Sequence, residues 1–306
     1  MQKHKYTRKL AFLFLFLLLF TSPLFCNGKE KKLSEEERAV LMEKYETIKK
    51  RLNYLYWLKS SSNLQKEINA MSYMIVDFSD NNVLLSKNDT LPYTIASVTK
   101  LMSAVVTEEN IDLDKEIVLT EKMLTPYGYS PVLFLGLMVS AQNLLNAALI
   151  QSTNDAVESL TYFLEDGEFV SLMNETAKEL GMENTVFYDA HGLNSSNMAT
   201  SSDLIKLLDY IRENHPEILE ITTNDNFWMP DSTGKMLKFK NLNIFHGISD
   251  FVGGKTGYLP EAKQTFVSLF EINGNDFGVV LLCSTNRKED IQNIYNWLKE
   301  NPELKI

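Results

Sequence analysis

The chain has 306 residues, of which 44% are hydrophobic and 23% are charged, and its formal net charge is −10. This length and balance are typical of a folded globular protein with one large domain or two small ones. An acidic chain is poorly suited to nucleic acid, because contacts to phosphates need clustered lysine and arginine. We therefore expect no nucleic-acid partner.

The first 28 residues differ in composition from the rest. Four basic residues precede an unbroken apolar run from Leu10 to Phe20. This pattern predicts a signal peptide over residues 1–28 and an exported, periplasmic or extracytoplasmic protein. The run is ~10 residues short of a full membrane span, but an uncleaved N-terminal anchor remains an alternative. Lipid attachment at Cys26 is disfavoured, because Phe25 stands where such signals usually have a small residue.

Residues 29–66 are rich in charge and in helix-forming residues. Ser34 and Glu37 form the pattern of a capping box that opens a helix. Apolar residues then recur at steps of four and three, which places them on one helix face: Leu41, Tyr45, Ile48, Leu52 and Leu55. We interpret this segment as a charged helical spacer. A helix lying on the body of the protein and a coiled coil remain open alternatives.

Strands and then helices follow. Met71 to Phe78 and Val83 to Ser86 predict two strands joined by a turn. A helix is expected from about Ala96, and residues 143–166 predict two helices interrupted around Ser152, because serine, threonine and asparagine compete with the helix backbone. A further helix is predicted up to Gly181.

The last third of the chain returns to strands. Ser202 and Asp203 are expected to cap another helix before that change. Gln264–Ile272 and Phe277–Ser284 predict a hairpin around the turn residues 273–276, and a final helix is expected over Asp290–Glu300. The order of strands, helices, strands and helix indicates an α+β fold, in which one sheet takes strands from both ends of the chain.

Three short motifs carry the chemistry. They are Ser97-Val-Thr-Lys100, Ser152-Thr-Asn154 and Lys255-Thr-Gly257. Each motif is weak alone, and Ser-x-x-Lys recurs at Ser232 and Lys235. Their order, spacing and local context together are typical of active-site serine enzymes that use a lysine as base.

The residue types suit acyl transfer. Residues three apart on a helix share a face, so Lys100 can take the proton of the nucleophile Ser97. Burial and a second cation, Lys255, would keep Lys100 neutral. The remaining expected roles are a proton relay by Ser152, a hydrogen bond to the substrate amide by Asn154, binding of an anionic substrate end by Lys255 and Thr256, and an oxyanion hole from the backbone N–H groups of Ser97 and Tyr258.

Other site types lack their local signatures. The chain has four histidines, and those beyond the predicted signal peptide are isolated in sequence. It contains no Gly-x-Ser-x-Gly, His-Glu-x-x-His or Cys-x-x-Cys. A Ser-His-Asp triad and a zinc site are therefore disfavoured.

The motifs and their surroundings resemble the low-molecular-mass penicillin-binding proteins, the D-alanyl-D-alanine carboxypeptidases of peptidase family S11. The resemblance runs from about Met71 to Thr285. It includes the stretch from Thr94 through Lys100, the stretch from Gln151 to Ala156, His191-Gly-Leu193, and Gly253 to Tyr258.

The resemblance implies a penicillin-recognising fold over residues 67–306, with a largely antiparallel sheet flanked by helices and a helical subdomain. It implies a serine-type D-Ala-D-Ala carboxypeptidase that acts on peptidoglycan stem peptides through an acyl-serine and binds β-lactam antibiotics. Lys255, Thr256 and Gly257 would bind the substrate carboxylate. The resemblance implies no cofactor and no metal. A D,D-endopeptidase, a β-lactamase and a catalytically silent peptidoglycan-binding protein remain alternatives. Class A β-lactamases need a Glu-x-x-x-Asn glutamate, and the match at Glu220 and Asn224 lies far from the second motif.

The chain departs from the family pattern in three places. Ile95 stands where proline is usual, and Thr153 replaces a common glycine, which puts the range of substrates in doubt. The chain stops at Ile306, before the C-terminal β-domain and amphipathic helix of many relatives. We expect any membrane association to come from the N-terminus.

Overall fold

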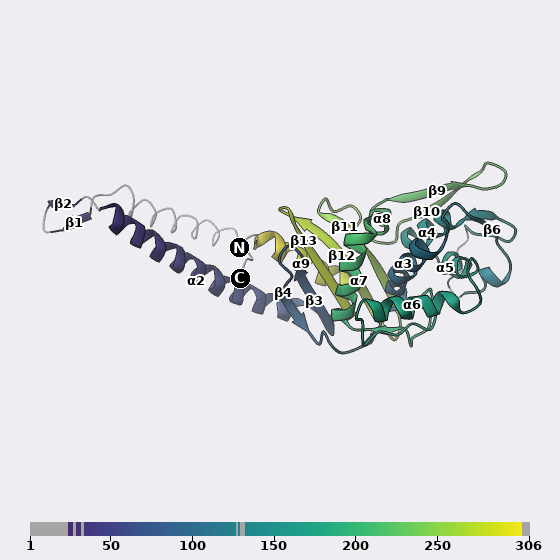
Figure 1. The fold of residues 1–306 in the computed structure, drawn as a ribbon, viewed down its shortest axis with the longest axis horizontal. Helices are drawn as coiled ribbons and strands as arrows, with labels where there is room; N and C mark the ends of the chain where they lie inside the picture. Colours follow the sequence, from purple (N-terminus) through teal and green to yellow (C-terminus); the bar gives the residue numbers. More distant parts are fainter. Residues whose placement is uncertain (1–23, 27–28, 32–33, 127, 129–131, 302–306) are drawn as a thin grey trace. The chain divides into compact units, whose positions relative to one another are not determined.

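The computed structural model describes residues 24–26, 29–31, 34–126, 128 and 132–301 (Figure 1). The predicted signal peptide lies almost entirely outside these residues. Two short strands at its end, β1 (Leu24–Cys26) and β2 (Lys29–Lys31), pair in antiparallel fashion. No helix within the described ranges is both long enough and apolar enough to span a membrane.

The charged segment forms one long helix, α2 (Glu35–Glu67). The predicted capping box is present, since Ser34 N–H donates to Glu37 and Glu37 N–H donates to Ser34 Oγ. The apolar side chains of Ile48, Leu52 and Leu55 are exposed on this helix. The chain divides into two compact units, the second of which begins at Ser61.

The second unit is built on one antiparallel sheet of five strands. Its strands lie in the order β11 (Phe251–Leu259), β12 (Lys263–Ile272), β13 (Asn275–Ser284), β3 (Ser72–Asp77) and β4 (Asn82–Lys87). The sheet therefore takes strands from both ends of the chain, as the sequence predicts. Strand β11, which carries the third motif, lies at an edge of the sheet.

Alternation along the strands places two apolar layers on the sheet. On one face, Val280 and Leu282 join the main core, and the ring of Phe78 lies over Gly278 beside Ile205 of α7 (Ser201–Asn214). The other face is covered by the C-terminal helix α9 (Arg287–Glu300), whose Tyr295 ring lies 5.8 Å from that of Phe270. Both faces are thus covered, which explains the nearly continuous apolar runs of β12 and β13.

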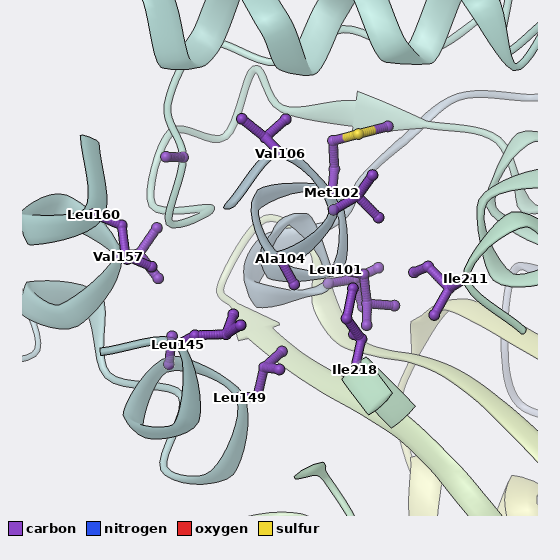
Figure 2. Close-up of a cluster of buried hydrophobic side chains, with 14 of the residues drawn as sticks. Leu101, Met102, Ala104, Val106, Leu145, Leu149, Val157, Leu160, Ile211 and Ile218 are labelled. Carbon is purple, nitrogen blue, oxygen red and sulfur yellow. The ribbon is translucent and has the colours of Figure 1, made fainter. Parts of the chain in front are cut away.

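A helical region completes the core around one central helix. This helix is α3 (Lys100–Asn110), which is buried over residues 100–107 and follows the short 3₁₀ helix η1 (Ala96–Thr99). Figure 2 shows Leu101, Met102 and Ala104 of α3 among apolar side chains of its neighbours. These neighbours are α4 (Ala141–Ile150), α5 (Asn154–Thr161), α6 (Glu168–Glu179), α7 and α8 (Pro216–Ile221).

The remaining strands form two-stranded pairs outside the main sheet. They are β5 (Tyr93–Thr94) with β8 (Met198–Ala199), β6 (Glu116–Val118) with β7 (Met138–Ser140), and β9 (Asn226–Pro230) with β10 (Met236–Lys240). A second 3₁₀ turn, η2, covers Lys122–Leu124.

Some predicted boundaries are wrong by a few residues. The N-cap of α7 is Thr200, whose Oγ1 accepts from Asp203 N–H at 3.0 Å, so Ser202 and Asp203 lie inside the helix. Helix α9 begins at Arg287 rather than Asp290, because Asn286 caps it by accepting from Glu289 N–H. In both cases a side chain upstream of the predicted start already satisfies the first free N–H groups.

Candidate active site

Ser97 and Lys100 meet at the entry to α3. Ser97 lies in the 3₁₀ turn η1 rather than in the first turn of an α-helix, and Lys100 is the first residue of α3. A 3₁₀ turn has three residues per turn, so positions i and i+3 lie directly in line. Lys100 Nζ is 3.1 Å from Ser97 Oγ.

Lys100 is almost fully enclosed, with 1% of its surface exposed. Its Nζ also contacts Asn154 Oδ1 at 2.7 Å and the His191 carbonyl oxygen at 2.5 Å. Burial lowers the pKa of Lys100 to about 7, against an opposing effect of the Asp189 carboxylate. A substantial fraction of this amine is therefore neutral near pH 7, which is the form a base requires.

Lys255 supplies a second buried amine from strand β11. Its Nζ donates to Ser152 Oγ at 2.8 Å and to the Thr256 carbonyl oxygen at 3.0 Å. Burial, and then the nearby charges of Lys100 and Arg287, hold the pKa of Lys255 well below its ordinary value. The third motif is thus brought next to the first two, although it lies far away in sequence.

Ser152 occupies the break between α4 and α5. Its φ of 58° lies in the left-handed region, which is unfavourable for a residue with a Cβ. This backbone turns Oγ toward Lys255. Within the described ranges, no hydrogen bond joins Ser152 to Ser97 or Lys100, and Ser152 Oγ accepts from Lys255 Nζ instead.

The backbone around Ser97 is closely packed by two glycines. A Cβ on Gly257 would lie 2.9 Å from Ser97 N and 2.4 Å from Thr265 Oγ1, so strand β11 passes directly beside the serine N–H. A Cβ on Gly192 would lie 2.1 Å from the Ala96 carbonyl oxygen. Tyr258, the other predicted oxyanion donor, follows Gly257 on the same strand, and its side chain is exposed.

Arg287 is a site residue that the sequence analysis did not identify. Its Nη1 donates to the Gly257 carbonyl at 2.8 Å and to the Thr265 carbonyl at 2.9 Å. Burial lowers the pKa of Arg287 to about 10, so it stays protonated at neutral pH. The sequence around Arg287 does not indicate a role in the site, because basic residues are common just after a strand. Only the pairing of β11, β12 and β13 brings Arg287 to the third motif.

Asp189 is the second residue that sequence reasoning missed. Its carboxylate accepts from Gly192 N–H at 2.6 Å, from Asn194 N–H at 2.5 Å and from Asn197 Nδ2 at 3.0 Å. These bonds close the turn that presents the His191 carbonyl to Lys100. The His191 ring lies between Asp189, at 3.3 Å, and Glu158 of α5, at 3.7 Å.

Comparisons with known proteins identify the family of the chain. The family model of D-alanyl-D-alanine carboxypeptidase, peptidase S11, matches residues 59–285. The chain is 32% identical over 224 residues to a D-alanyl-D-alanine endopeptidase of Haemophilus influenzae, covering 71% of this chain and 76% of that one. It is 26% identical to a D-alanyl-D-alanine carboxypeptidase of Mycobacterium tuberculosis, covering 70% and 74% of the two chains.

Solved structures show the same fold. A variant of the Streptomyces K15 DD-transpeptidase superposes with a TM-score of 0.70 at 23% identity, covering 78% of this chain and 99% of that one. Penicillin-binding protein D2 of Listeria monocytogenes in its cefotaxime-bound form gives 0.67 at 25% identity, covering 77% and 98%. Both are penicillin-recognising folds with an antiparallel sheet and helices. The chain belongs to the D-alanyl-D-alanine carboxypeptidase family, peptidase family S11, and is a serine-type D-Ala-D-Ala peptidase.

Proposed function

We propose that the protein is an exported D-Ala-D-Ala carboxypeptidase of peptidoglycan stem peptides, which works through an acyl-ester on Ser97. The observation that carries this proposal is the set of contacts around Lys100. Two of its three partners, Asn154 Oδ1 and the His191 carbonyl, can only accept hydrogen bonds. When Lys100 is neutral, its two N–H groups can serve these acceptors, and its lone pair then faces the Ser97 hydroxyl.

The reaction follows from that geometry. Neutral Lys100 takes the proton of Ser97 Oγ while Oγ attacks the carbonyl carbon of the penultimate D-alanine. The N–H groups of Ser97 and Tyr258 stabilise the oxyanion. The C–N bond then breaks, and the proton that Lys100 took from Ser97 passes, with Ser152 as relay, to the leaving D-alanine amine, so that Lys100 is neutral again. Water adds to the acyl-ester in the same way and releases the shortened stem with a free carboxylate.

The substrate's terminal carboxylate would lie along the edge strand β11. The guanidinium of Arg287 would make this end of the cleft cationic, which suits a carboxylate. A bound carboxylate would favour the charged form of Lys255 and accept a hydrogen bond from the Thr256 hydroxyl. Asn154, oriented by Lys100, would bond the substrate amide. A β-lactam carries a comparable carboxylate and carbonyl, so we propose that it acylates Ser97 in the same way.

A D,D-endopeptidase is the second candidate, because relatives with 32% identity carry that name. The two reactions use the same acyl-enzyme and differ in the leaving amine. Incubation with a purified stem pentapeptide and, separately, with a cross-linked muropeptide dimer separates them. Release of D-alanine supports the carboxypeptidase, whereas conversion of dimer to monomers without D-alanine release supports the endopeptidase.

One experiment tests the acyl-enzyme directly. Penicillin should add its full mass to the intact protein, and peptide mapping should place the adduct on Ser97. The Ser97→Ala variant serves as the control. Absence of an adduct on the folded wild-type protein would contradict the proposed function. The same spectrum of protein from an exporting host reads the mature N-terminus, and a chain still beginning at Met1 would contradict the proposed signal peptide 1–28.

We propose no β-lactamase role for Glu220 and Asn224. Asn224 Nδ2 donates to the carbonyl oxygens of Glu220 and Ile221, so it caps the end of α8. Both residues are exposed. Slow release of the penicillin adduct, over minutes or longer, is the expected result.

A further inference from the structure

The hairpin of β9 and β10 has an outer face that the proposed chemistry does not use. Its inward side chains are Phe227, Met229, Leu237 and Phe239, which pack in or against the main core. The alternate residues point the other way. We define the outer face as Asn226, Trp228, Pro230, Met236, Lys238 and Lys240. In Figure 1 the hairpin projects from the region of α4 and α8.

The outer face combines exposed apolar surface with cationic groups. Trp228 and Met236 are each 50% exposed. Trp228 and Lys238 are a direct cross-strand pair, and Lys238 Nζ lies 5.0 Å from the indole ring centroid. Met236 pairs with Pro230 on the same face, next to the Trp228–Lys238 pair, so the exposed apolar side chains are grouped rather than scattered. Grouped apolar surface of this kind marks sites that contact other molecules.

The lysines of this face are available to an anion. Neither Lys238 nor Lys240 has a carboxylate partner among the residues that the structure describes. The two acidic side chains that flank β9 have contacts of their own: Asp231 accepts from Thr233 within the turn, and Asp225 accepts from Asn226 and lies 3.5 Å from His246. In a chain of net charge −10, a local cationic surface stands out electrostatically.

The outer face leads directly to the catalytic site. Lys240 N–H donates to Gln151 Oε1 at 3.1 Å, and Leu242 N–H donates to the Ile150 carbonyl at 3.2 Å. These partners immediately precede Ser152. At about 3.4 Å per residue, the Trp228–Lys238 pair lies about 7 Å beyond Lys240 along the hairpin. A polymer held on this face could therefore place one of its branches in the site.

We propose that the outer face of the β9–β10 hairpin binds the peptidoglycan polymer itself, next to the stem that is being cut. Trp228 offers a flat apolar surface for the apolar side of a sugar ring. Lys238 and Lys240 offer charges for the carboxylates of neighbouring stem peptides. This inference rests on the proposed function, because only a peptidoglycan substrate joins a cleavable stem to sugars and further carboxylates.

The test compares a polymeric substrate with a soluble one. Two variants of the full chain are made, Trp228→Ala and the double change Lys238→Glu with Lys240→Glu. We expect cleavage of insoluble sacculi to fall about tenfold for each, while Ser97 acylation by fluorescent penicillin and hydrolysis of a soluble pentapeptide stay within about twofold of wild type. Met138→Ala, a 54% exposed methionine on the separate hairpin β6–β7, and Lys178→Glu on α6 are matched controls.

A binding measurement keeps this inference separate from the proposed chemistry. The Ser97→Ala chain is sedimented with sacculi and with vesicles containing phosphatidylglycerol, with and without Trp228→Ala. Sacculus binding that Trp228→Ala weakens supports the proposal, even if acylation of Ser97 failed. Equal cleavage and equal sacculus binding by wild type and the hairpin variants would overturn it. Binding to vesicles alone would also overturn it and would assign the face to an anionic lipid surface.

Discussion

Lys100 and Lys255 are buried without a carboxylate within ion-pair distance among the described residues, and this decides their chemistry. A buried ammonium that lacks a counter-ion loses its proton more readily. The nearest opposing influence on Lys100 is Asp189, whose own charge is shared among several N–H donors. Lys100 is therefore partly uncharged at neutral pH. Burying this amine lowers the free energy of unfolding, which is a common cost of a functional site.

The pH dependence of acylation follows from Lys100. With a pKa of about 7, roughly a tenth of Lys100 is neutral at pH 6 and roughly nine tenths at pH 8. We expect the second-order rate constant for penicillin acylation to rise about tenfold between these values and then level off. Stopped-flow fluorescence with a labelled penicillin measures it. A rate that falls across this range would show that Lys100 is not the base.

Asp189→Asn should shift the pH profile of acylation to lower pH. The Asp189 carboxylate favours the charged form of Lys100, so its removal makes Lys100 easier to deprotonate. The asparagine oxygen can still accept from the Gly192 or Asn194 N–H and keep part of the turn. We expect the ratio of acylation rates at pH 8 and pH 6 to fall from about tenfold to less than about fivefold.

Glu158→Gln is the matched control for this change. Glu158 approaches the other side of the His191 ring, at 3.7 Å, and does not bond the turn backbone. We expect its profile to stay close to that of wild type. Equal profiles for Asp189→Asn and wild type would show that Asp189 only positions the turn.

At the scale of elements, two segments approach the 3₁₀ turn η1, which carries Ser97, at backbone distance. The turn from Asp189 to Asn194 presses Gly192 against Ala96, and strand β11 presses Gly257 against Ser97. Ala96 itself has a positive φ of 50°. The serine is therefore held by backbone packing on both sides, which leaves its N–H little freedom to move.

Comparing Gly192→Ala with Gly136→Ala distinguishes the effect of a clash with neighbouring backbone from the effect of a left-handed backbone conformation. The two glycines have nearly equal φ angles, 83° and 82°, but a Cβ on Gly136 would meet nothing within 4 Å. Gly136→Ala should lower the free energy of unfolding by about 1–2 kcal/mol because of the left-handed backbone. Gly192→Ala should lower it further, because its Cβ would also lie 2.1 Å from the Ala96 carbonyl oxygen. Gly192→Ala should in addition slow acylation at least about 100-fold, since Ala96 and Ser97 must move. Equal acylation by the two variants would contradict this account.

The cap of α7 gives a second comparison between neighbouring positions. Thr200→Ala removes the acceptor of the Asp203 N–H and should cost about 1 kcal/mol of unfolding free energy. Ser202→Ala, at a position inside the helix, should change it by less than about 0.5 kcal/mol. Urea unfolding followed by circular dichroism measures both. A larger loss for Ser202→Ala would favour the cap that the sequence predicts.

At the scale of the whole molecule, local spacing explains what the sequence could predict. Ser97 and Lys100 are three residues apart, and the break at Ser152 follows from side chains that compete with the helix backbone. Alternating and continuous apolar runs predicted the strands β12 and β13. These patterns involve residues that are close in sequence, so they can be recognised before the three-dimensional structure is known.

Long-range pairing explains what could not be predicted. Arg287 reaches Gly257 only because β11, β12 and β13 are neighbours in the sheet. Asp189 acts through its hydrogen bonds to the turn that brings the His191 carbonyl to Lys100. The residues that share the outer face of the β9–β10 hairpin also depend on the register of the two strands. A lone arginine, aspartate or tryptophan carries no spacing that distinguishes these positions from ordinary surface residues.

The second compact unit of the chain begins at Ser61, near the end of α2. The buried residues of the second unit begin with Ser61, Leu64 and Ile68, and Asn69 N–H donates to Asp290 Oδ1 at 2.7 Å. Upstream on α2, the apolar side chains of residues 48, 52, 55 and 58 are exposed. A chain that starts at Ser61 therefore keeps the buried contacts of this unit and should fold by itself.

We expect this shortened chain to unfold cooperatively, with a Tm within about 3 °C of the full chain, a difference of about 1 kcal/mol for a domain of this size. Its penicillin acylation rate should stay within about twofold. A chain that starts at Asn69 also loses the buried side chains of Leu64 and Ile68, so its Tm should fall by about 6 °C or more. Differential scanning calorimetry distinguishes the two. If deletion to Ser61 alone lowered the Tm as much, α2 would be part of the catalytic unit rather than a separate spacer.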